Sequence, residues 1–543
     1  MGGMAEPPGN ILYYGDNLDV LRQHVPDESV DLVYLDPPFN SNASYNVLFA
    51  EHSGERSASQ IKAFEDTWRW DQAAAAAYET TVEAGGDVSR TMQAFRTILS
   101  TSNMLAYLAM MAPRLIELRR ALKQTGSLYL HCDPTASHYL KLLLDAVFGP
   151  ERFRSEIIWK RTTAHSSAKR YAPVHDVILY YVKAPKPTWN APRDPYEQEY
   201  LDKYYRFDDG DGRLYWRADL CAAGVRHGES GKPWRGIDPG VKGMHWKFGV
   251  GRLDELDAEG RIYWPPKGTM PQYKRYREEL KGKAVSDLWT DVDRINPVGG
   301  ERLGYPTQKP EALLDRIVQA SSNPGDVVLD PFCGCGTTIA SAQRLGRRWI
   351  GIDVTALATS LIKVRLKDAF GDAAQFHTVG EPITTTDAAE LAASDPYQFQ
   401  WWALGLVGAR PVDEKKGADK GIDGRIYFHD EEQGGKTKQI VLSVKAGKVQ
   451  VQHLRDLRGV IDREEAQIGV LVSLQVPTKP MRVEAASAGF YESPWGKHPR
   501  LQLLTVEELL DDATIDMPPQ QSSVTFKRAP KAKVKPDESD PLF

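Results

Sequence analysis

The first part of the chain alternates short apolar runs with longer stretches in which apolar residues recur at helical spacing. Residues 30–35 form an apolar run that ends at Asp36, and residues 71–122 are rich in Ala, Met, Leu and Arg at intervals typical of helices. Further strands are predicted at 11–14, 127–131, 155–159, 176–182, 327–330 and 348–353. Strands that alternate with helices predict an α/β sheet, which binds ligands at the carboxyl ends of its strands.

The same pattern divides the chain into five parts. The α/β alternation occupies residues 1–184 and resumes in residues 301–385, whereas residues 185–300 hold short segments rich in aromatic residues and glycine, typical of an inserted α+β domain. Residues 395–515 form a separate α/β unit. The Pro, Lys, Ser and Asp content of residues 516–543 predicts a disordered tail. In the fourth part, strands are expected at 424–428, 439–444 and 468–472 and a helix at 451–461.

Composition narrows the class of protein. A chain of 543 residues with 41% hydrophobic and 26% charged residues is expected to form several globular domains. No apolar run approaches the roughly 18 residues that span a bilayer, and the first residues lack a signal-peptide pattern. We therefore expect no membrane partner and a cytoplasmic location. The four cysteines form no Cys-x-x-Cys pair, which argues against a disulfide framework and a zinc ribbon.

A loop with two glycines follows the predicted strand at 327–330. Its sequence, Asp330-Pro331-Phe332-Cys333-Gly334-Cys335-Gly336-Thr337, precedes a helix and suits close approach of the backbone to a ligand. It lacks the Lys of a phosphate-binding P-loop and the spacing of a dinucleotide loop. Asp353 ends the next strand and is placed to accept hydrogen bonds from two ribose hydroxyls. The structural alternative is a tight turn with Asp353 as a helix cap.

A second motif, Asp36-Pro37-Pro38-Phe39, ends the apolar run at 30–35. The prolines restrict the backbone and leave carbonyl oxygens as acceptors. An aromatic amine is a poor nucleophile, and two acceptors placed against its N–H groups draw the nitrogen toward tetrahedral geometry. Asp36 and the Pro37 carbonyl are the natural pair, and Phe39 suits stacking on a base flipped out of a duplex. An ordinary turn at the end of a strand is the alternative.

Six motifs in order resemble the amino-group DNA methyltransferases of the β arrangement, which are related to the type III modification methylases. They are Tyr14-Gly15-Asp16, Asp36-Pro37-Pro38-Phe39, residues 126–133, Thr307-Gln308-Lys309-Pro310, residues 330–336 and Gly351-Ile352-Asp353. The resemblance implies a circularly permuted Rossmann-like fold that uses S-adenosylmethionine, with target recognition in residues 185–300.

The resemblance also implies a role for each matching residue. Those expected at the cofactor are Asp16 near the adenine ring, Asp353 at the ribose, and Lys309, Pro310, Asp330, Phe332, Gly334, Gly336 and Thr337 around the methionine part. Asp36, Pro37, Pro38 and Phe39 are expected to act on the base, with no metal and no cysteine adduct. Asp36 favours adenine N6 because cytosine-N4 enzymes commonly begin the motif with Ser; cytosine N4 is the alternative. Phe39 keeps the stacking face of the family's usual Tyr without its hydroxyl.

Double-stranded DNA is the expected partner. The net charge is −5, so local basic segments carry this expectation. Candidate DNA contacts are Lys160, Arg161, Lys267, Lys274, Arg275 and Arg277. A solvated helix face is the alternative for the basic run, and Trp234, Trp246 and Trp264 are expected in a core. A second copy of the chain and a restriction subunit are further partners that fit the resemblance, in a restriction-modification or host-defence setting.

The C-terminal part carries a different set of residues. Asp423 precedes one predicted strand, and Ser443 and Lys445 lie on the next, an arrangement that resembles the Mrr-like nucleases of the PD-(D/E)xK type. Such enzymes hold a divalent metal, so Asp423 and Mg²⁺ form a candidate metal site. Ser443 stands where the family carries Glu or Gln and is a poorer ligand. Metal-dependent cleavage and a degenerate DNA-binding module are therefore both open.

Two alternatives compete with a DNA-modifying enzyme. A methylase half that has become a cofactor sensor is one, but the intact Asp36, Gly334, Gly336 and Asp353 argue against it. Methylation of RNA or of a protein amide is the other, since such enzymes use a similar turn that usually begins with Asn. Asp36 and the large insertion disfavour that activity.

Overall fold

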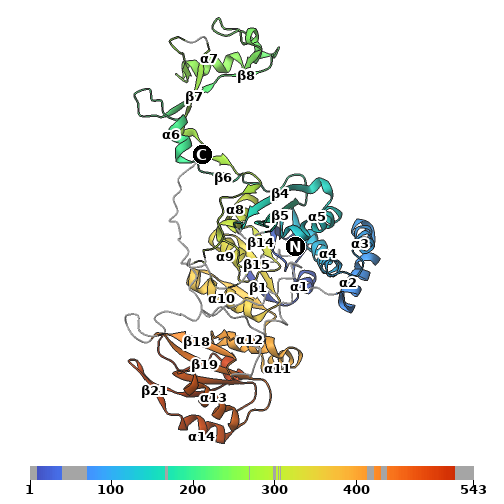
Figure 1. The fold of residues 1–543 in the computed structure, drawn as a ribbon, viewed down its shortest axis with the longest axis vertical. Coiled ribbons are helices and arrows are strands. Elements are labelled where there is room, and N and C mark those ends of the chain that lie inside the picture. The colour runs from blue at the N-terminus through green and yellow to red at the C-terminus, as the bar shows by residue number, and fades with distance from the viewer. Residues whose placement is uncertain are drawn as a thin grey trace, which may run out of the picture. The chain divides into compact units, whose positions relative to one another are not determined.

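The computed structural model describes residues 9–38, 70–164, 169–267, 270–296, 301, 303, 305, 307–412, 421–429 and 437–519. Two compact units form (Figure 1). One comprises residues 191–286, and the other is built from the described chain up to Asn190 and from Asp287 onward. None of the helices in these ranges combines the length and apolar character that a bilayer crossing requires.

A nine-stranded sheet organises the larger unit, in the order β13-β4-β5-β3-β2-β14-β15-β1-β16. Its strands are β1 (Asn10–Tyr14), β2 (Val30–Leu35), β3 (Leu122–Cys132), β4 (Phe153–Lys160), β5 (His175–Val182), β13 (Leu288–Trp289), β14 (Val327–Asp330), β15 (Arg348–Asp353) and β16 (Phe376–Val379). β5 runs antiparallel to both of its neighbours, and the other pairs are parallel. The α/β sheet expected from the sequence is therefore present, and antiparallel β5 makes it a mixed sheet.

The centre of this sheet joins the two halves of the chain. β2 pairs with β14 in parallel, with Leu32 opposite Val328 and Val33 opposite Leu329. The six residues of β2 are all buried, because helices cover both of its faces. Asp36 and Asp330 consequently leave the sheet at the same edge, although the sequence places them in different halves.

Helices cover both faces of the sheet (Figure 1). One face carries α1 (Asn17–His24), α4 (Asn103–Ala121) and α5 (Pro134–Phe148), with α2 (Gln72–Glu83) and α3 (Gly86–Leu99) packed on them; the other carries α8 (Glu311–Ser321), α9 (Thr337–Arg344) and α10 (Ala356–Phe370). Three helices thus occupy the region 71–122 in which helical spacing was predicted. They are separated where Gly85 and Ser102 take the N-cap positions of α3 and α4.

A five-stranded sheet forms the C-terminal part of the same unit, in the order β17-β18-β19-β20-β23. Its elements are α11 (Thr385–Ser394), α12 (Pro396–Leu406), β17 (Arg410–Pro411), β18 (Gly424–Phe428), β19 (Lys438–Lys445), α13 (Val451–Arg463), β20 (Ile468–Ser473), α14 (Lys479–Ser487), β21 (Phe490–Ser493), β22 (Gly496–Pro499), β23 (Leu501–Thr505) and α15 (Val506–Leu510). The expected tail begins at residue 516, and its first residues, 516–519, are among those that the structure describes. Asp516 lies 2.7 Å from His498 Nδ1, and its N–H donates to Gln502 Oε1 at 2.9 Å. Residues 520–543 lie outside the described residues.

The smaller unit has a three-stranded antiparallel sheet, in the order β10-β11-β7. Its elements are β6 (Arg193–Asp194), α6 (Gln198–Tyr204), β7 (Tyr215–Asp219), β8 (Cys221–Ala223), β9 (Met244–Trp246), α7 (Val250–Ala258), β10 (Ile262–Tyr263), β11 (Gln272–Tyr276) and β12 (Lys283–Ala284). Trp234 and Trp246 lie in the core as expected. Trp264 does not; it is 40% exposed and stacks on Trp234 with ring centroids 5.4 Å apart.

Candidate functional site

The turn after β2 carries Asp36, which contacts the segment that contains Lys309. The Asp36 side chain is 16% exposed, and its Oδ2 forms an ion pair with Lys309 Nζ, from a segment 273 residues away. Lys309 Nζ also donates to the Thr307 carbonyl at 3.5 Å. Pro37 is buried and Pro38 is half-buried, while Phe39 lies outside the described residues. The tertiary fold therefore brings residue 36 of the first predicted motif to Lys309 of the second.

The glycine loop after β14 requires its glycines. Gly334 and Gly336 have φ of +49° and +72°, in the left-handed region. A Cβ at Gly334 would lie 3.2 Å from the Tyr305 ring, and one at Gly336 would lie 2.7 Å from Ile362. The Gly334 N–H donates to Asp353 Oδ2 at 2.9 Å. The loop is thus drawn against the end of β15.

Asp353 is oriented from two sides. Its Oδ1 accepts hydrogen bonds from the Thr355 N–H at 2.9 Å and the Thr355 hydroxyl at 2.8 Å, while Oδ2 accepts from Gly334. Burial raises the pKa of the Asp353 carboxyl. The alternative role as a helix cap is wrong, because Thr355 is the N-cap of α10 and accepts from the Ala358 N–H. A fixed, buried carboxylate at a strand's carboxyl end suits a ligand with hydroxyl donors.

Asp330 adds a third acid at this edge. Its Oδ1 accepts from the Phe332 N–H at 3.0 Å. Burial, followed by the charges of Asp36 and Asp353, raises the pKa of Asp330 to about 7. Three carboxyl groups that influence one another through charge make the edge suited to a cationic ligand group.

The β1–α1 turn closes the same edge. Asp16 Oδ1 accepts from the Leu18 N–H at 2.7 Å, and Arg114 Nη2 donates to Asp16 Oδ1 at 3.0 Å and to Oδ2 at 2.8 Å. Asn17 Nδ2 donates to the Pro331 carbonyl at 2.7 Å. Asp16 therefore caps a helix and pairs with Arg114, while its neighbour holds the glycine loop. Sequence reasoning found Asp16 but missed Arg114 and Asn17.

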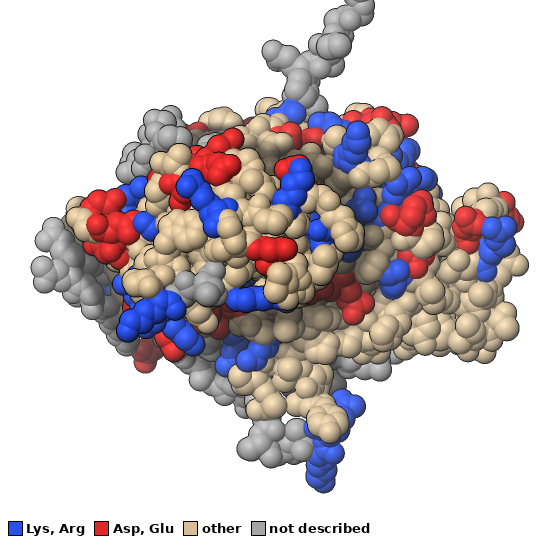
Figure 2. Space-filling view, turned by 90° about the horizontal axis from the view of Figure 1, so that it is seen from above, with Lys and Arg blue, Asp and Glu red and all other residues tan. Residues whose placement is uncertain are grey.

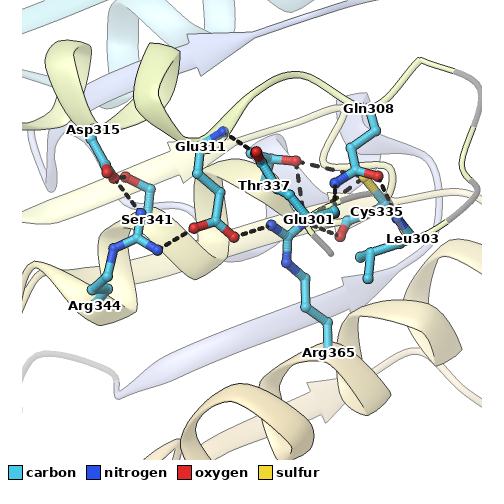
Figure 3. A network of polar contacts seen from close by, with 10 residues as sticks. All are labelled: Glu301, Leu303, Gln308, Glu311, Asp315, Cys335, Thr337, Ser341, Arg344 and Arg365. Atoms are coloured by element: carbon cyan, nitrogen blue, oxygen red, sulfur yellow. Dashed lines mark hydrogen bonds and ion pairs between the residues drawn. The ribbon is translucent and has the colours of Figure 1, made fainter. Parts of the chain in front are cut away.

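A buried polar network supports the loop from behind (Figure 3). The Arg365 side chain, 2% exposed, donates to the Cys335 carbonyl at 3.0 Å and Thr337 Oγ1 at 3.1 Å, and pairs with Glu311 Oε1 at 2.8 Å. Glu311 also pairs with Arg344. Arg365 thus ties the loop to the start of α8.

Gln308 and Pro310 fix the chain at the start of α8. Gln308 Nε2 donates to the Glu301 carbonyl at 2.7 Å, and its Oε1 accepts from the Leu303 N–H at 2.8 Å (Figure 3). Pro310, which is buried, is the N-cap residue of α8. The segment 307–310 is therefore held on both sides of Lys309.

A chain of polar contacts crosses four strands next to Asp36. Tyr34 Oη lies 2.9 Å from His131 Nδ1, His131 Nε2 lies 3.2 Å from Asp176 Oδ2, and Arg161 Nε lies 3.1 Å from Asp176 Oδ1. Burial acts to raise the pKa of Asp176, but the His131 hydrogen bond and the charges of His131 and Arg161 hold it below its ordinary value. No short motif signals this set, because each member comes from a different strand or its end.

The predicted DNA contacts are exposed to different degrees. Lys160, Arg161, Lys267 and Arg275 are exposed, and Arg277 is half-buried at the start of a 3₁₀ turn. Lys274 is 13% exposed, and its Nζ lies 2.6 Å from Asp209 Oδ2. The helical alternative for the basic run is wrong, since residues 272–276 form strand β11. Lys and Arg are interspersed with Asp and Glu over the face shown in Figure 2.

The Asp423 carboxylate in the C-terminal part accepts hydrogen bonds from three protein groups. Asp423 Oδ2 accepts from the Ser443 hydroxyl at 3.1 Å and the Val444 N–H at 2.6 Å, and Oδ1 accepts from Gln400 Nε2 at 3.2 Å. Lys445 Nζ lies 3.7 Å from Oδ2. Among the described residues there is no group of three or more His, Cys, Asp or Glu that could hold a metal. The geometry gives the expected Mg²⁺ site no support.

Two family models match the chain. Residues 30–363 match a family described as DNA methylase, and residues 397–511 match one described as NACHT-associated inactive Restriction Endonuclease 1. The latter description agrees with the occupied carboxylate of Asp423 and lends no support to metal-dependent cleavage of the Mrr-like type.

Comparisons with individual proteins agree with the match to the DNA methylase family. Type II methyltransferase M.EcaI of Enterobacter cloacae is 33% identical over 359 residues, which cover 66% of this chain and 69% of that protein. The StyLTI Mod subunit of the type III restriction-modification enzyme of Salmonella typhimurium is 25% identical over 410 residues, 71% of this chain and 58% of that protein. The solved M1.HpyAVI–SAM complex is 15% identical, covers 66% of this chain and 98% of that one, and has a TM-score of 0.29. At that score the structural likeness carries no argument.

Proposed function

This chain belongs to the DNA methylase family of N6 and N4 methyltransferases, and on that premise we propose that it methylates an exocyclic amine of a base flipped out of double-stranded DNA, adenine N6 being the target. The observation that carries the proposal is the pairing of β2 with β14. It brings the acceptors of residues 36–38 to the edge that holds the glycine loop. Asp36, where a cytosine-N4 enzyme commonly has Ser, supports adenine.

S-adenosylmethionine is the methyl donor we infer, and the residues present fit it. Asp353 would receive the ribose hydroxyls, and Phe332, Gly334, Gly336 and Thr337 would surround the methionine part with Lys309 and Pro310. Asp16 would lie toward the adenine ring. The acids at 330, 36 and 353 suit a cationic sulfonium. When bound, the cofactor supplies an electrophilic methyl group.

The residues of the turn act on the amine. We assign Asp36 Oδ1 and the Pro37 carbonyl to accept the two N–H groups, which draws the nitrogen toward tetrahedral geometry and frees its lone pair for attack. Lys309 pairs with Oδ2 and keeps the Asp36 side chain oriented. Pro38 stiffens the turn, Phe39 stacks on the base, and the proton that the nitrogen loses leaves through Asp36.

DNA contact is proposed for the exposed Lys160, Arg161, Lys267 and Arg275 and for the half-buried Arg277, which would bind phosphates. Lys274 is left out, because Asp209 engages its ammonium. The smaller unit, residues 191–286, is the proposed recognition domain.

The C-terminal part is proposed as a DNA-binding module that does not cut, since its acid is occupied and its matched family is described as inactive. The StyLTI relative is named as the Mod subunit of a restriction-modification enzyme. A restriction subunit is therefore a proposed partner for this chain, and a second copy of the chain is another.

Expression in a methylation-free host, followed by sequencing of its genome for modified bases, tests the function. We expect N6-methyladenine within one recognition sequence, lost in Asp36→Ala and retained in Asp372→Ala, which changes an exposed acid elsewhere in the same unit. N4-methylcytosine would overturn the adenine assignment. An unmodified genome alongside methylated RNA or protein, or tight binding of cofactor without any transfer, would overturn DNA methylation itself.

A further inference from the structure

The C-terminal part packs on α10, the helix that follows β15. Leu357 and Leu361 of α10 share one buried cluster with Phe399 and Trp402 of α12. The two helices approach so closely that a Cβ at Gly405 would lie 2.3 Å from Ser360 Oγ. α12 thus packs on the helix that begins three residues after Asp353.

One side chain of α12 reaches the first turn of that helix. Gln398 is 8% exposed, and its Oε1 accepts a hydrogen bond from the Ala356 N–H at 3.0 Å. The first N–H groups of a helix have no partner within the helix. Thr355, the N-cap, accepts from Ala358 instead. The partner of Ala356 therefore comes from residues 397–511, outside the region that matches the methylase family.

Short contacts continue from this bond to the glycine loop. Ala356 follows Thr355, whose N–H and hydroxyl both donate to Asp353 Oδ1. Asp353 Oδ2 accepts from the Gly334 N–H. Each link is between 2.8 and 3.0 Å; the three links at Thr355 and Ala356 are buried, and the one from Gly334 is part-buried.

We propose that Gln398 is a positioning residue for the cofactor: by anchoring Ala356 it holds the Thr355 turn, and so keeps Asp353 and the glycine loop in the arrangement that binds S-adenosylmethionine. The inference rests on the proposed function, which supplies the cofactor. It makes the inactive nuclease-like domain a working part of the methyltransferase site and not only an attached DNA-binding module.

The same helix offers a matched control. Gln400 also makes a side-chain hydrogen bond, to Asp423, but that bond stays within the C-terminal part. Gln398→Met and Gln400→Met remove the same amide from the same helix at nearly unchanged volume. A general loosening of the C-terminal part affects both variants, whereas loss of the link to Ala356 affects only the first.

The test uses the full chain and two measurements. Titration calorimetry gives the Kd for S-adenosylmethionine, and amide hydrogen exchange without cofactor gives the protection of residues 353–358. We expect Gln398→Met to raise Kd roughly fivefold and to speed exchange in 353–358, with Gln400→Met close to wild type. Gln398→Asn, which keeps the amide but shortens its reach, should behave like Gln398→Met and serves if the Met variant does not fold.

Two results overturn the proposal: unchanged Kd and exchange in both Gln398 variants, or equal changes in Gln398→Met and Gln400→Met. Failure of the proposed cofactor assignment looks different, since wild-type protein would then not bind S-adenosylmethionine at all. In that case the exchange measurement, which needs no cofactor, still decides whether Gln398 holds the Asp353 turn.

Discussion

The buried acid Asp330 gives a prediction whose sign and size follow from its surroundings. Burial and the charges of Asp36 and Asp353 raise its pKa from the ordinary 3.8 to about 7. Asp330→Asn keeps an oxygen to accept from the Phe332 N–H but cannot ionise. Because the two side chains have nearly the same shape, the substitution isolates the cost of the buried charge.

Whether the free energy of unfolding rises or falls with pH depends on which state, folded or unfolded, binds the proton of Asp330. Between about pH 4 and pH 7 the folded protein binds a proton on Asp330 that the unfolded chain has released, so the free energy of unfolding falls as pH rises through this window. The loss of stability caused by ionising buried Asp330 is absent below pH 4 and complete above pH 7. Roughly three pKa units at about 1.4 kcal/mol each give a penalty of about 4 kcal/mol. Asp330→Asn cannot ionise and does not lose this stability. Its free energy of unfolding relative to wild type should therefore rise by about 4 kcal/mol between pH 4 and pH 7.

Urea unfolding of both proteins at intervals from pH 4 to pH 8 measures this difference, and titrations elsewhere in the chain largely cancel. Asp372→Asn, which changes an exposed acid elsewhere in the same unit, serves as the control. A sulfonium favours ionised Asp330, so cofactor affinity should also rise with pH through about 7 in wild type and stay flat in the Asn variant. A stability difference that is constant across the window would refute the account of Asp330.

Three further outcomes test other parts of the site. Tyr34→Phe removes the hydrogen-bond partner of His131 Nδ1 and should cost about 1–2 kcal/mol of stability with the Kd for S-adenosylmethionine unchanged; an unchanged free energy of unfolding would contradict this. Arg365→Met leaves Glu311 short of a buried partner and should cost about 3–5 kcal/mol in urea unfolding, which a loss under 1 kcal/mol, roughly the value of a surface pair, would disprove. Supercoiled plasmid incubated with Mg²⁺ or Mn²⁺ should stay intact with both wild type and Lys445→Ala; nicking by wild type alone would restore the nuclease hypothesis.

Much of the local structure was readable from the chain. The apolar run at 30–35 and the strands at 327–330 and 348–353 form at the predicted residues, because continuous apolar runs bounded by Asp, Gly or Pro are typical of buried parallel strands. The secondary structure of the basic run at 267–283 was harder to predict. Its residues suit an exposed helix face, but pairing of β11 with β7 and β10 makes residues 272–276 a strand.

The sequence by itself determined which chemical groups stand at strand ends, since that depends on local order along the chain: Asp36 after one strand, Asp330 and its glycines after another, Asp353 after a third. Only the tertiary structure decided their partners. The pairing of β2 with β14 brings Lys309 to Asp36 across 273 residues, burial of Arg365 places it under the loop, and docking of α12 puts Gln398 on Ala356. Such contacts are set by packing, because a buried polar group must find whichever partner the fold brings within reach.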